Sequence, residues 1–231
     1  MLKKLFCFFI LVLVAATLYA QPTTKLKRKD YTKDVKLVTD KGDIILRLND
    51  STPIHRDNFL KLVKSKYYNG IAFHRVIKGF MAQAGNAATK TGKDTSDRLL
   101  GNYTIDAEIL PMLYHKKGAL AAARMGDDVN PGRRSSGVQF YIVQGKTFTD
   151  AQLDSVQTRR LQGKSISEQR REHYKTIGGT PQLDGAYTVF GEVVKGLDVV
   201  DAIANTPTSK QPPDKPTTDI RIKKAKLVKR R

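Results

Sequence analysis

Several short stretches of the chain alternate apolar with polar residues, and this period of two is typical of β-strands. The clearest example is residues 44–48, where every second residue is Ile or Leu. A turn-like Asp-Lys-Gly-Asp at residues 40–43 separates this stretch from the apolar residues 35–38, so we expect a hairpin to open the domain. Further strands are expected at residues 71–77, 138–143 and from 220 onward.

Other stretches have apolar residues at helical spacing. Residues 53–67 begin with proline after a capping residue and carry an apolar stripe, and residues 196–204 form a second, shorter amphipathic pattern. Between residues 147 and 178, charged residues with scattered Leu, Val and Ile predict two short helices, at 150–160 and 167–174. The pattern therefore predicts a strand-rich domain with two amphipathic helices and a helical insertion.

The first twenty residues have the charged start, apolar middle and small-residue exit of a secretory signal peptide. We expect cleavage after Ala20 and a location in the periplasm. An uncleaved signal that anchors the protein in the membrane is the alternative, although the apolar run is short for a span. Residues 21–32 are polar and basic and predict a flexible lead-in.

The chain is strongly basic, with 41 Lys and Arg against 22 Asp and Glu and a formal net charge of +19. Such an excess favours nucleic acid, anionic membrane surfaces or acidic client proteins as partners. The basic residues are spread out, with one dense cluster at residues 221–231, and no stacking aromatic residues lie among them as single-strand binding would favour. We expect no nucleic-acid binding, a solvated surface with at most weak attraction to anionic surfaces, and a basic tail at 229–231.

Candidate chemistry is concentrated in residues 71–86. Arg75 cannot lose its charge and presents a rigid fork of donors, which suits it to hold a carbonyl oxygen or a developing lone pair. If residues 71–77 are a strand, Phe73, Arg75 and Ile77 share one face and His74 lies on the other. Apolar and amide side chains follow directly and would suit a pocket for an uncharged ring: Phe80, Met81 and Gln83. The alternative is a solvated arginine beside ordinary core residues.

The order of these residues closely resembles the signature of the cyclophilins, which are barrel-shaped peptidyl-prolyl cis-trans isomerases. The matching run is Phe73-His74-Arg75-Val76-Ile77-x-Gly79-Phe80-Met81-x-Gln83-x-Gly85. The resemblance covers residues 33–228, with 147–178 as an insertion relative to compact members. It implies an all-β fold, a closed eight-stranded antiparallel barrel with a helix over each end. It also implies a strand at residues 118–125, where the alanine content alone would predict a helix.

The resemblance assigns roles to individual residues. Arg75 is implied as the catalytic residue, acting on the twisted bond. Substrate-binding residues are implied at Phe80, Met81, Gln83, Ala123, Arg124, Gln139, Tyr141, Leu183 and Tyr187. Without the resemblance, the Gln139 and Tyr141 pair would indicate only a polar strand face. The sequence departs from the family pattern at Arg124, Tyr187 and Gln182, where asparagine, histidine and tryptophan are common, and the last difference puts recognition of the inhibitor cyclosporin in doubt.

The implied function is the isomerisation of X-Pro peptide bonds in exported or envelope proteins during folding. The expected partners are proline-containing peptides and unfolded client proteins, the expected state is a monomer, and no cofactor is required. We expect no metal site, because the four histidines, at positions 55, 74, 115 and 173, are dispersed. The alternatives are a proline-peptide binding module or holdase on the same scaffold and, with no motif behind it, a basic surface adhesin.

The insertion at residues 147–178 supplies none of the implied site residues, yet the chain enters and leaves it between strands that do. We therefore expect it to engage client proteins without contributing to the isomerisation chemistry. A decorative insertion is the alternative, since surface loops tolerate added length at small entropic cost.

Overall fold

The computed structural model describes residues 24–91 and 103–230. The predicted signal peptide and its cleavage site lie outside the described residues. The expected lead-in is packed where it is described. It contains a short 3-10 helix, η1 (Arg28–Asp30), and Leu26 and Tyr31 pack against the core.

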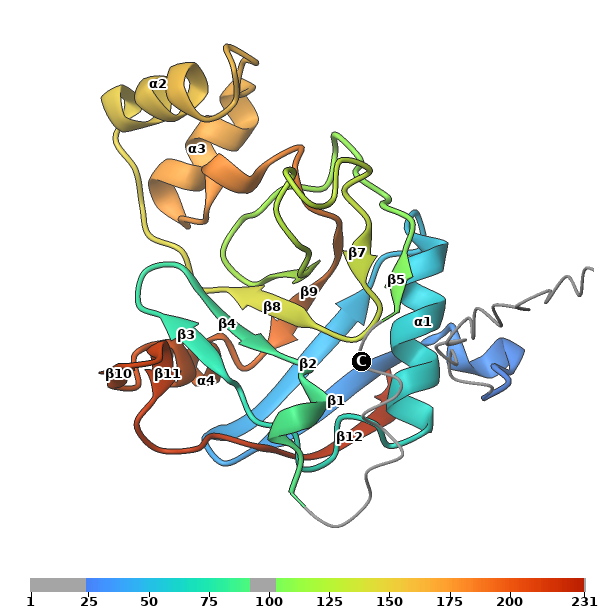
Figure 1. The fold of residues 1–231 in the computed structure, drawn as a ribbon. Helices are drawn as coiled ribbons and strands as arrows, with labels where there is room; N and C mark the ends of the chain where they lie inside the picture. Colours follow the sequence, from blue (N-terminus) through green and yellow to red (C-terminus); the bar gives the residue numbers. More distant parts are fainter. Residues whose placement is uncertain (1–23, 92–102, 231) are drawn as a thin grey trace, which may run out of the picture.

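Eight antiparallel strands form one sheet in the order β12-β1-β2-β9-β6-β8-β4-β3 (Figure 1). Apolar and polar residues alternate in its first hairpin, as the sequence predicts, so one face is buried. The strands are β1 (Lys33–Thr39), β2 (Gly42–Leu48), β3 (Arg75–Ile77), β4 (Met81–Ala84), β6 (Ala119–Ala122), β8 (Phe140–Val143), β9 (Val189–Lys195) and β12 (Ile222–Lys229). The strand expected around residues 118–125 is confirmed as β6.

The barrel is a half-barrel and is open, so the expected closed barrel is not confirmed. β12 and β3 are the two ends of the sheet. The segments that precede these two strands are joined by an isolated bridge, Ala72 to Arg221, and by backbone bonds such as Phe73 N to Ile220 O at 2.8 Å. Residues 71–74 are not a regular strand and β3 has three residues, so no strand ladder spans this edge.

The irregular backbone before β3 also corrects the predicted face of Phe73. Arg75 pairs with Gln83 and Ile77 with Met81, so these four side chains share the outer face of the sheet. Phe73 is instead buried in the main core together with Val76. The period of two fails at residues 72–74 because they lie outside the ladder.

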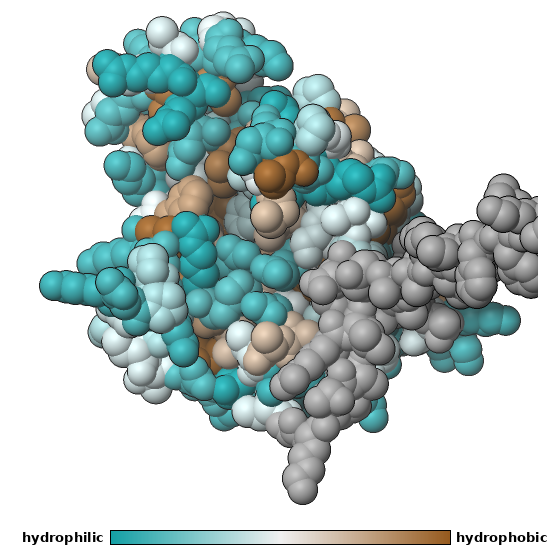
Figure 2. Space-filling view, in the orientation of Figure 1, coloured by the Kyte–Doolittle hydropathy of each residue, from teal (hydrophilic) through white to brown (hydrophobic). Residues whose placement is uncertain are grey.

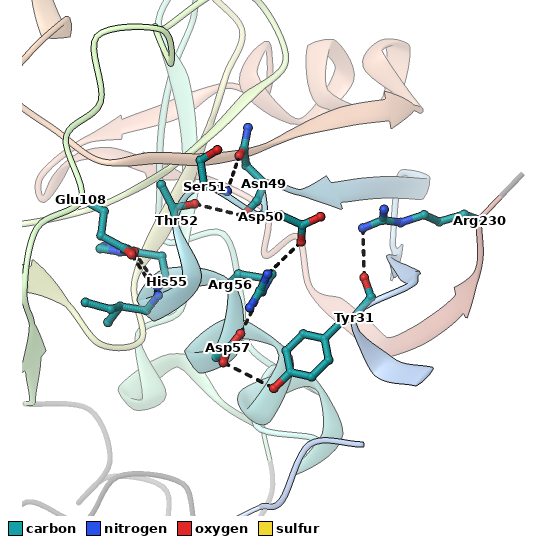
Figure 3. A network of polar contacts seen from close by, with 11 residues as sticks. Tyr31, Asn49, Asp50, Ser51, Thr52, His55, Arg56, Asp57, Glu108 and Arg230 are labelled. Carbon is teal, nitrogen blue, oxygen red and sulfur yellow. Dashed lines mark hydrogen bonds and ion pairs between the residues drawn. The ribbon is translucent and has the colours of Figure 1, made fainter. Parts of the chain in front are cut away.

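Two helices contribute buried residues to this core, α1 (Pro53–Lys64) and α4 (Leu197–Ala204). Figure 3 shows how the start of α1 is capped. Thr52 makes no side-chain capping bond. Glu108 instead accepts from the backbone N–H groups of Ile54 and His55 at 3.0 and 2.9 Å, so a carboxylate satisfies the free donors at the positive end of the helix.

The insertion contains the two predicted helices, α2 (Asp150–Arg159) and α3 (Glu168–Thr176), which stand away from the sheet in Figure 1. Its buried residues, Leu153, Ile166 and Tyr174, form a small cluster separate from the main core. Arg171 joins the two helices through Asp150 and Asp154.

Shorter elements complete the described chain. β5 (Thr104–Ile105) pairs with β7 (Ser135–Ser136), and β10 (Thr208–Lys210) pairs with β11 (Pro213–Pro216). The 3-10 helices η2 (Ala87–Thr89) and η4 (Pro181–Leu183) lie in connections. The expected basic tail continues the sheet, because Lys229 belongs to β12 and the Arg230 side chain donates to Tyr31 O at 3.2 Å.

Candidate active site

The first side of the candidate site is the hairpin of β3 and β4 with its turn, which we call the hairpin wall. The register Arg75 to Gln83 and Ile77 to Met81 places the guanidinium, the amide and the thioether on one outer face. Gly79 sits in the turn with φ +72°, a conformation that favours glycine, and its N–H donates to Gln144 Oε1 at 2.6 Å. The β3–β4 ladder thus sets the faces of the signature residues, and Gln144 from outside the run holds the turn.

The floor of the site comes from the neighbouring strands. Tyr141 on β8 lies opposite Gln83 on β4 and opposite Ala121 on β6, and its side chain is buried. Gln139 does not line the cavity, but its Oε1 accepts from Gln83 Nε2 at 3.0 Å and so orients that amide. The predicted pairing of Gln139 and Tyr141 on one face is consistent with this arrangement.

The opposite side is residues 180–187, which we call the loop wall. Leu183 ends η4 and Tyr187 follows just before β9. The Arg124 guanidinium lies 4.5 Å from the centre of the Tyr187 ring, donates from Nε to Ala186 O at 2.8 Å and pairs with Asp127 at 2.6 Å. Arg124 is thus an anchor of the loop wall, and its charge is compensated.

These three parts enclose a cavity of about 250 Å³. Its lining consists of residues that the sequence predicts for the site, and all predicted residues except Gln139 contribute: Arg75, Phe80, Met81, Gln83, Ala123, Arg124, Tyr141, Leu183 and Tyr187. Met81 and Tyr141 are almost fully buried, whereas Arg75 is half-exposed. The arrangement places an apolar floor beside a fixed cation, which suits an uncharged ring joined to a polar backbone.

The Arg75 guanidinium has a partner that the sequence did not indicate. Its Nε donates to Asp214 Oδ2 at 3.1 Å, and Asp214 lies on β11, far along the chain. Within the described part of the chain, neither Nη group of Arg75 makes a recorded hydrogen bond. Two of the three donor groups of the fork therefore remain for a ligand.

Buried polar groups lie behind the site. Burial lowers the pKa of His74, and the neighbouring charge of Arg75 lowers it further. His115 and Asp184 form a buried pair, with His115 Nδ1 at 3.0 Å from Asp184 Oδ1. Sequence reasoning missed His115, Asp184 and Asp214, because no local motif joins residues so distant in the chain.

No group of three or more His, Cys, Asp or Glu in residues 24–91 and 103–230 could hold a metal ion. In the same ranges, no helix has the length and apolar character needed to cross a membrane.

Comparisons with known proteins agree with this geometry. Residues 34–227 match the family described as cyclophilin type peptidyl-prolyl cis-trans isomerase/CLD. A relative from Staphylococcus saprophyticus, named as a peptidyl-prolyl cis-trans isomerase, is 34% identical over 215 residues, which cover 92% of this chain and 99% of the relative.

Two solved structures of a cyclophilin-type isomerase from Cryptosporidium parvum share the fold. One has a TM-score of 0.60 at 27% identity and covers 86% of this chain and 99% of its own. The other was determined in the presence of the dipeptide Ala-Pro and has a TM-score of 0.59 at 26% identity, covering 85% of this chain and 99% of its own. The chain therefore belongs to the cyclophilin-type peptidyl-prolyl cis-trans isomerases and is an enzyme of that class.

Proposed function

We propose that the 250 Å³ cavity binds the proline of a peptide and that Arg75 accelerates rotation about the preceding bond. The observation that carries the proposal is the single cavity that joins the half-exposed guanidinium to a buried apolar floor. The related Cryptosporidium structure with Ala-Pro supports a proline-containing ligand.

Amide resonance gives the X-Pro bond a rotational barrier of about 18–20 kcal/mol. Twisting the bond makes the proline nitrogen pyramidal and gives it a lone pair. The free Nη groups of Arg75 donate to that nitrogen or to the proline carbonyl, and this interaction is strongest in the twisted state. Gln83, oriented by Gln139, holds the neighbouring backbone.

The ring of the proline is held while the residue before it rotates. Phe80, Met81, Tyr141 and Leu183 provide the apolar contacts, and the small Ala123 leaves room for the peptide beside the guanidinium of Arg124. The reaction breaks no covalent bond, so these residues need no cofactor to perform it.

The proposed setting is the folding of exported proteins. Two features support it: the signal-peptide pattern of residues 1–20 and the apolar patches in the hollow between the α2–α3 lobe and the half-barrel (Figure 2). Elsewhere on the described surface, large apolar side chains are about half or more exposed and offer contacts to an unfolded client: Met112, Met125, Val129 and Ile177. The intact mass of the protein from the envelope fraction tests export, and retention of residues 1–20 would instead support a membrane anchor.

A protease-coupled assay on an Ala-Pro test peptide tests the role of Arg75. Arg75→Ala should reduce kcat/KM by about 10²–10³, as for the loss of one donor to a transition-state charge, and should weaken peptide binding much less. Arg75→Lys should restore little, because an ammonium lacks the fork.

The chain offers a matched control in Arg134, which is half-exposed like Arg75 and is also paired with an aspartate, Asp106. Arg134→Ala lies outside the cavity and should leave turnover unchanged. Equal losses of affinity and rate in Arg75→Ala would favour a proline-peptide binding module over an isomerase site at this cavity.

A further inference from the structure

A buried chain of hydrogen bonds runs from the insertion to the floor of the cavity. Tyr174 in α3 donates its hydroxyl to Asp184 Oδ2 at 2.7 Å. Asp184 Oδ1 accepts from the His115 backbone N at 2.9 Å and lies 3.0 Å from His115 Nδ1. His115 Nε2 lies 2.9 Å from the Tyr141 hydroxyl.

All four side chains are shielded from solvent. Tyr174 is 0% exposed, His115 1% and Tyr141 5%, and the Asp184 side chain is 8% exposed. Burial raises the pKa of both tyrosines above the ordinary value, so each hydroxyl keeps its proton. Asp184 already accepts from the Tyr174 hydroxyl and the His115 backbone N–H, so the tautomer that fits this network donates from His115 Nδ1 to Asp184 and accepts at Nε2 from Tyr141.

The network contacts both the floor and the loop wall. The His115 ring is stacked on Tyr141, with 10° between the planes, and meets the edge of Tyr187. The His115 carbonyl accepts from Thr180 N at 2.8 Å, and Asp184 directly follows Leu183. His115 therefore contacts the loop wall at three places, Thr180, Asp184 and Tyr187.

The insertion adds the remaining donor of this network. Tyr174 belongs to the small core of the insertion, and its hydroxyl reaches out of that core to Asp184. Without this hydroxyl, Asp184 Oδ2 would lose a charge-assisted bond in a site with little access to water, so the carboxylate would have to reorient.

We propose that Tyr174, Asp184 and His115 are positioning residues for isomerisation, and that the insertion holds the loop wall and the Tyr141 ring against the bound proline. This inference rests on the proposed assignment of Tyr141 and Leu183 to the proline pocket. It gives the insertion a part in building the site, which differs from the purely client-binding role expected from the sequence.

The first experiment compares Tyr174→Phe with Arg171→Ala in the full chain, using kcat/KM on the Ala-Pro test peptide well below the unfolding temperature of each variant. Tyr174→Phe removes only the hydroxyl and should lower kcat/KM about tenfold, which corresponds to about 1.4 kcal/mol. Arg171→Ala breaks ion pairs within the insertion but not the network, so it should lower stability without changing turnover.

A spectroscopic readout separates positioning from general destabilisation. In tyrosine-labelled protein, the Tyr141 ring resonance can be assigned by its loss in Tyr141→Phe. It should shift in Tyr174→Phe and stay in place in Arg171→Ala. The double variant Tyr174→Phe/Tyr141→Phe should be no slower than Tyr141→Phe, because both changes cut one chain of bonds.

Two further variants divide the network at His115. His115→Asn places an amide N–H near the former Nδ1 and retains the bond to Asp184, whereas His115→Gln places its amide near the former Nε2, where the carbonyl oxygen accepts from Tyr141. Both should lower kcat/KM, since each leaves one end of the network unpaired.

Wild-type kcat/KM in folded Tyr174→Phe, or additive losses in the double variant, would overturn the positioning role. Failure of the pocket assignment looks different: in that case Arg75→Ala and Tyr141→Ala would themselves retain wild-type turnover.

Discussion

The two sides of the proposed proline pocket are held by different forces. In the hairpin wall, Arg75, Met81 and Gln83 are fixed by main-chain pairing between β3 and β4, which are neighbours in sequence. In the loop wall, Leu183 and Tyr187 lie outside regular strands and depend on side chains, chiefly His115, Asp184 and Arg124. The Arg75 guanidinium thus sits on a hairpin whose register is set by adjacent strands, while the residues opposite depend on side chains from distant parts of the chain.

The largest loss of stability among these predictions is expected where the loop wall joins the insertion. Gly145 and Gly179 touch there, and a Cβ on Gly145 would lie 2.4 Å from Gly179 Cα. Gly163 is a matched control, since it also has positive φ but open space around its Cβ. Gly145→Ala should lose about 1–3 kcal/mol more stability than Gly163→Ala, because backbone must move to relieve the overlap.

Chemical denaturation measures this difference, and the peptide assay should show reduced kcat/KM in Gly145→Ala alone. Equal stabilities of the two variants would mean that the junction adapts without cost and that the loop wall is less dependent on it than we argue.

A smaller change in the free energy of unfolding is expected from the protonation of His74, which directly precedes the hairpin wall. The pKa of His74 is lowered in the folded protein, so as pH falls through 6.5 the unfolded chain takes up a proton first. The free energy of unfolding should therefore be greatest above pH 6.5 and fall toward pH 5, by at most about 1.4 kcal/mol per pH unit for one proton. His55, whose pKa is also lowered by burial, should contribute in the same window.

Denaturation curves between pH 5 and 8 test this effect. His74→Gln should flatten the dependence in part and leave the share of His55. Asp30 and Asp40 have lowered pKa values and lose their contributions only near and below pH 4, so they do not obscure the histidine window. An unchanged slope in His74→Gln would show that this ring titrates alike in both states.

The difference between the walls also explains what the sequence could predict. The hairpin wall was predicted residue by residue because its side chains share one strand-turn-strand unit with a recognisable order. The loop-wall residues Leu183 and Tyr187 were found only through the resemblance. The support from His115, Asp184 and Tyr174 was not found, because side-chain bonds between distant residues leave no periodicity in the sequence. The closed barrel was implied by the resemblance, and the apolar alternation does not reveal that residues 71–74 leave the ladder.

One substitution at the surface of the loop wall tests whether its residues are correctly placed beside the cavity. Gln182 is only partly buried and lies beside Leu183, where tryptophan is common in related proteins. Cyclosporin should inhibit the natural protein weakly, and Gln182→Trp should strengthen inhibition by about 0.5–1.5 kcal/mol through aromatic contact, without changing turnover on short peptides. An inhibition titration on the natural protein and on Gln182→Trp measures the two affinities. Tight inhibition of the natural protein would show that residues 182–183 are wrongly assigned to this wall.

The smallest effect is expected from the ion pair between Arg75 and Asp214, which tests whether the hairpin wall is self-contained. The pair is partly exposed, with 45% and 34% of the side chains accessible, and such pairs contribute about 0–1 kcal/mol. Asp214 also partly neutralises the charge that Arg75 presents to the twisted bond.

Asp214→Asn should therefore raise kcat/KM modestly, by less than about fivefold, and the gain should shrink at high salt because screening weakens the pair in the natural protein as well. A salt series of the peptide assay on both proteins measures this. A fall in kcat/KM would instead mean that Asp214 positions the guanidinium, and the hairpin wall would then depend on a distant residue just as the loop wall does.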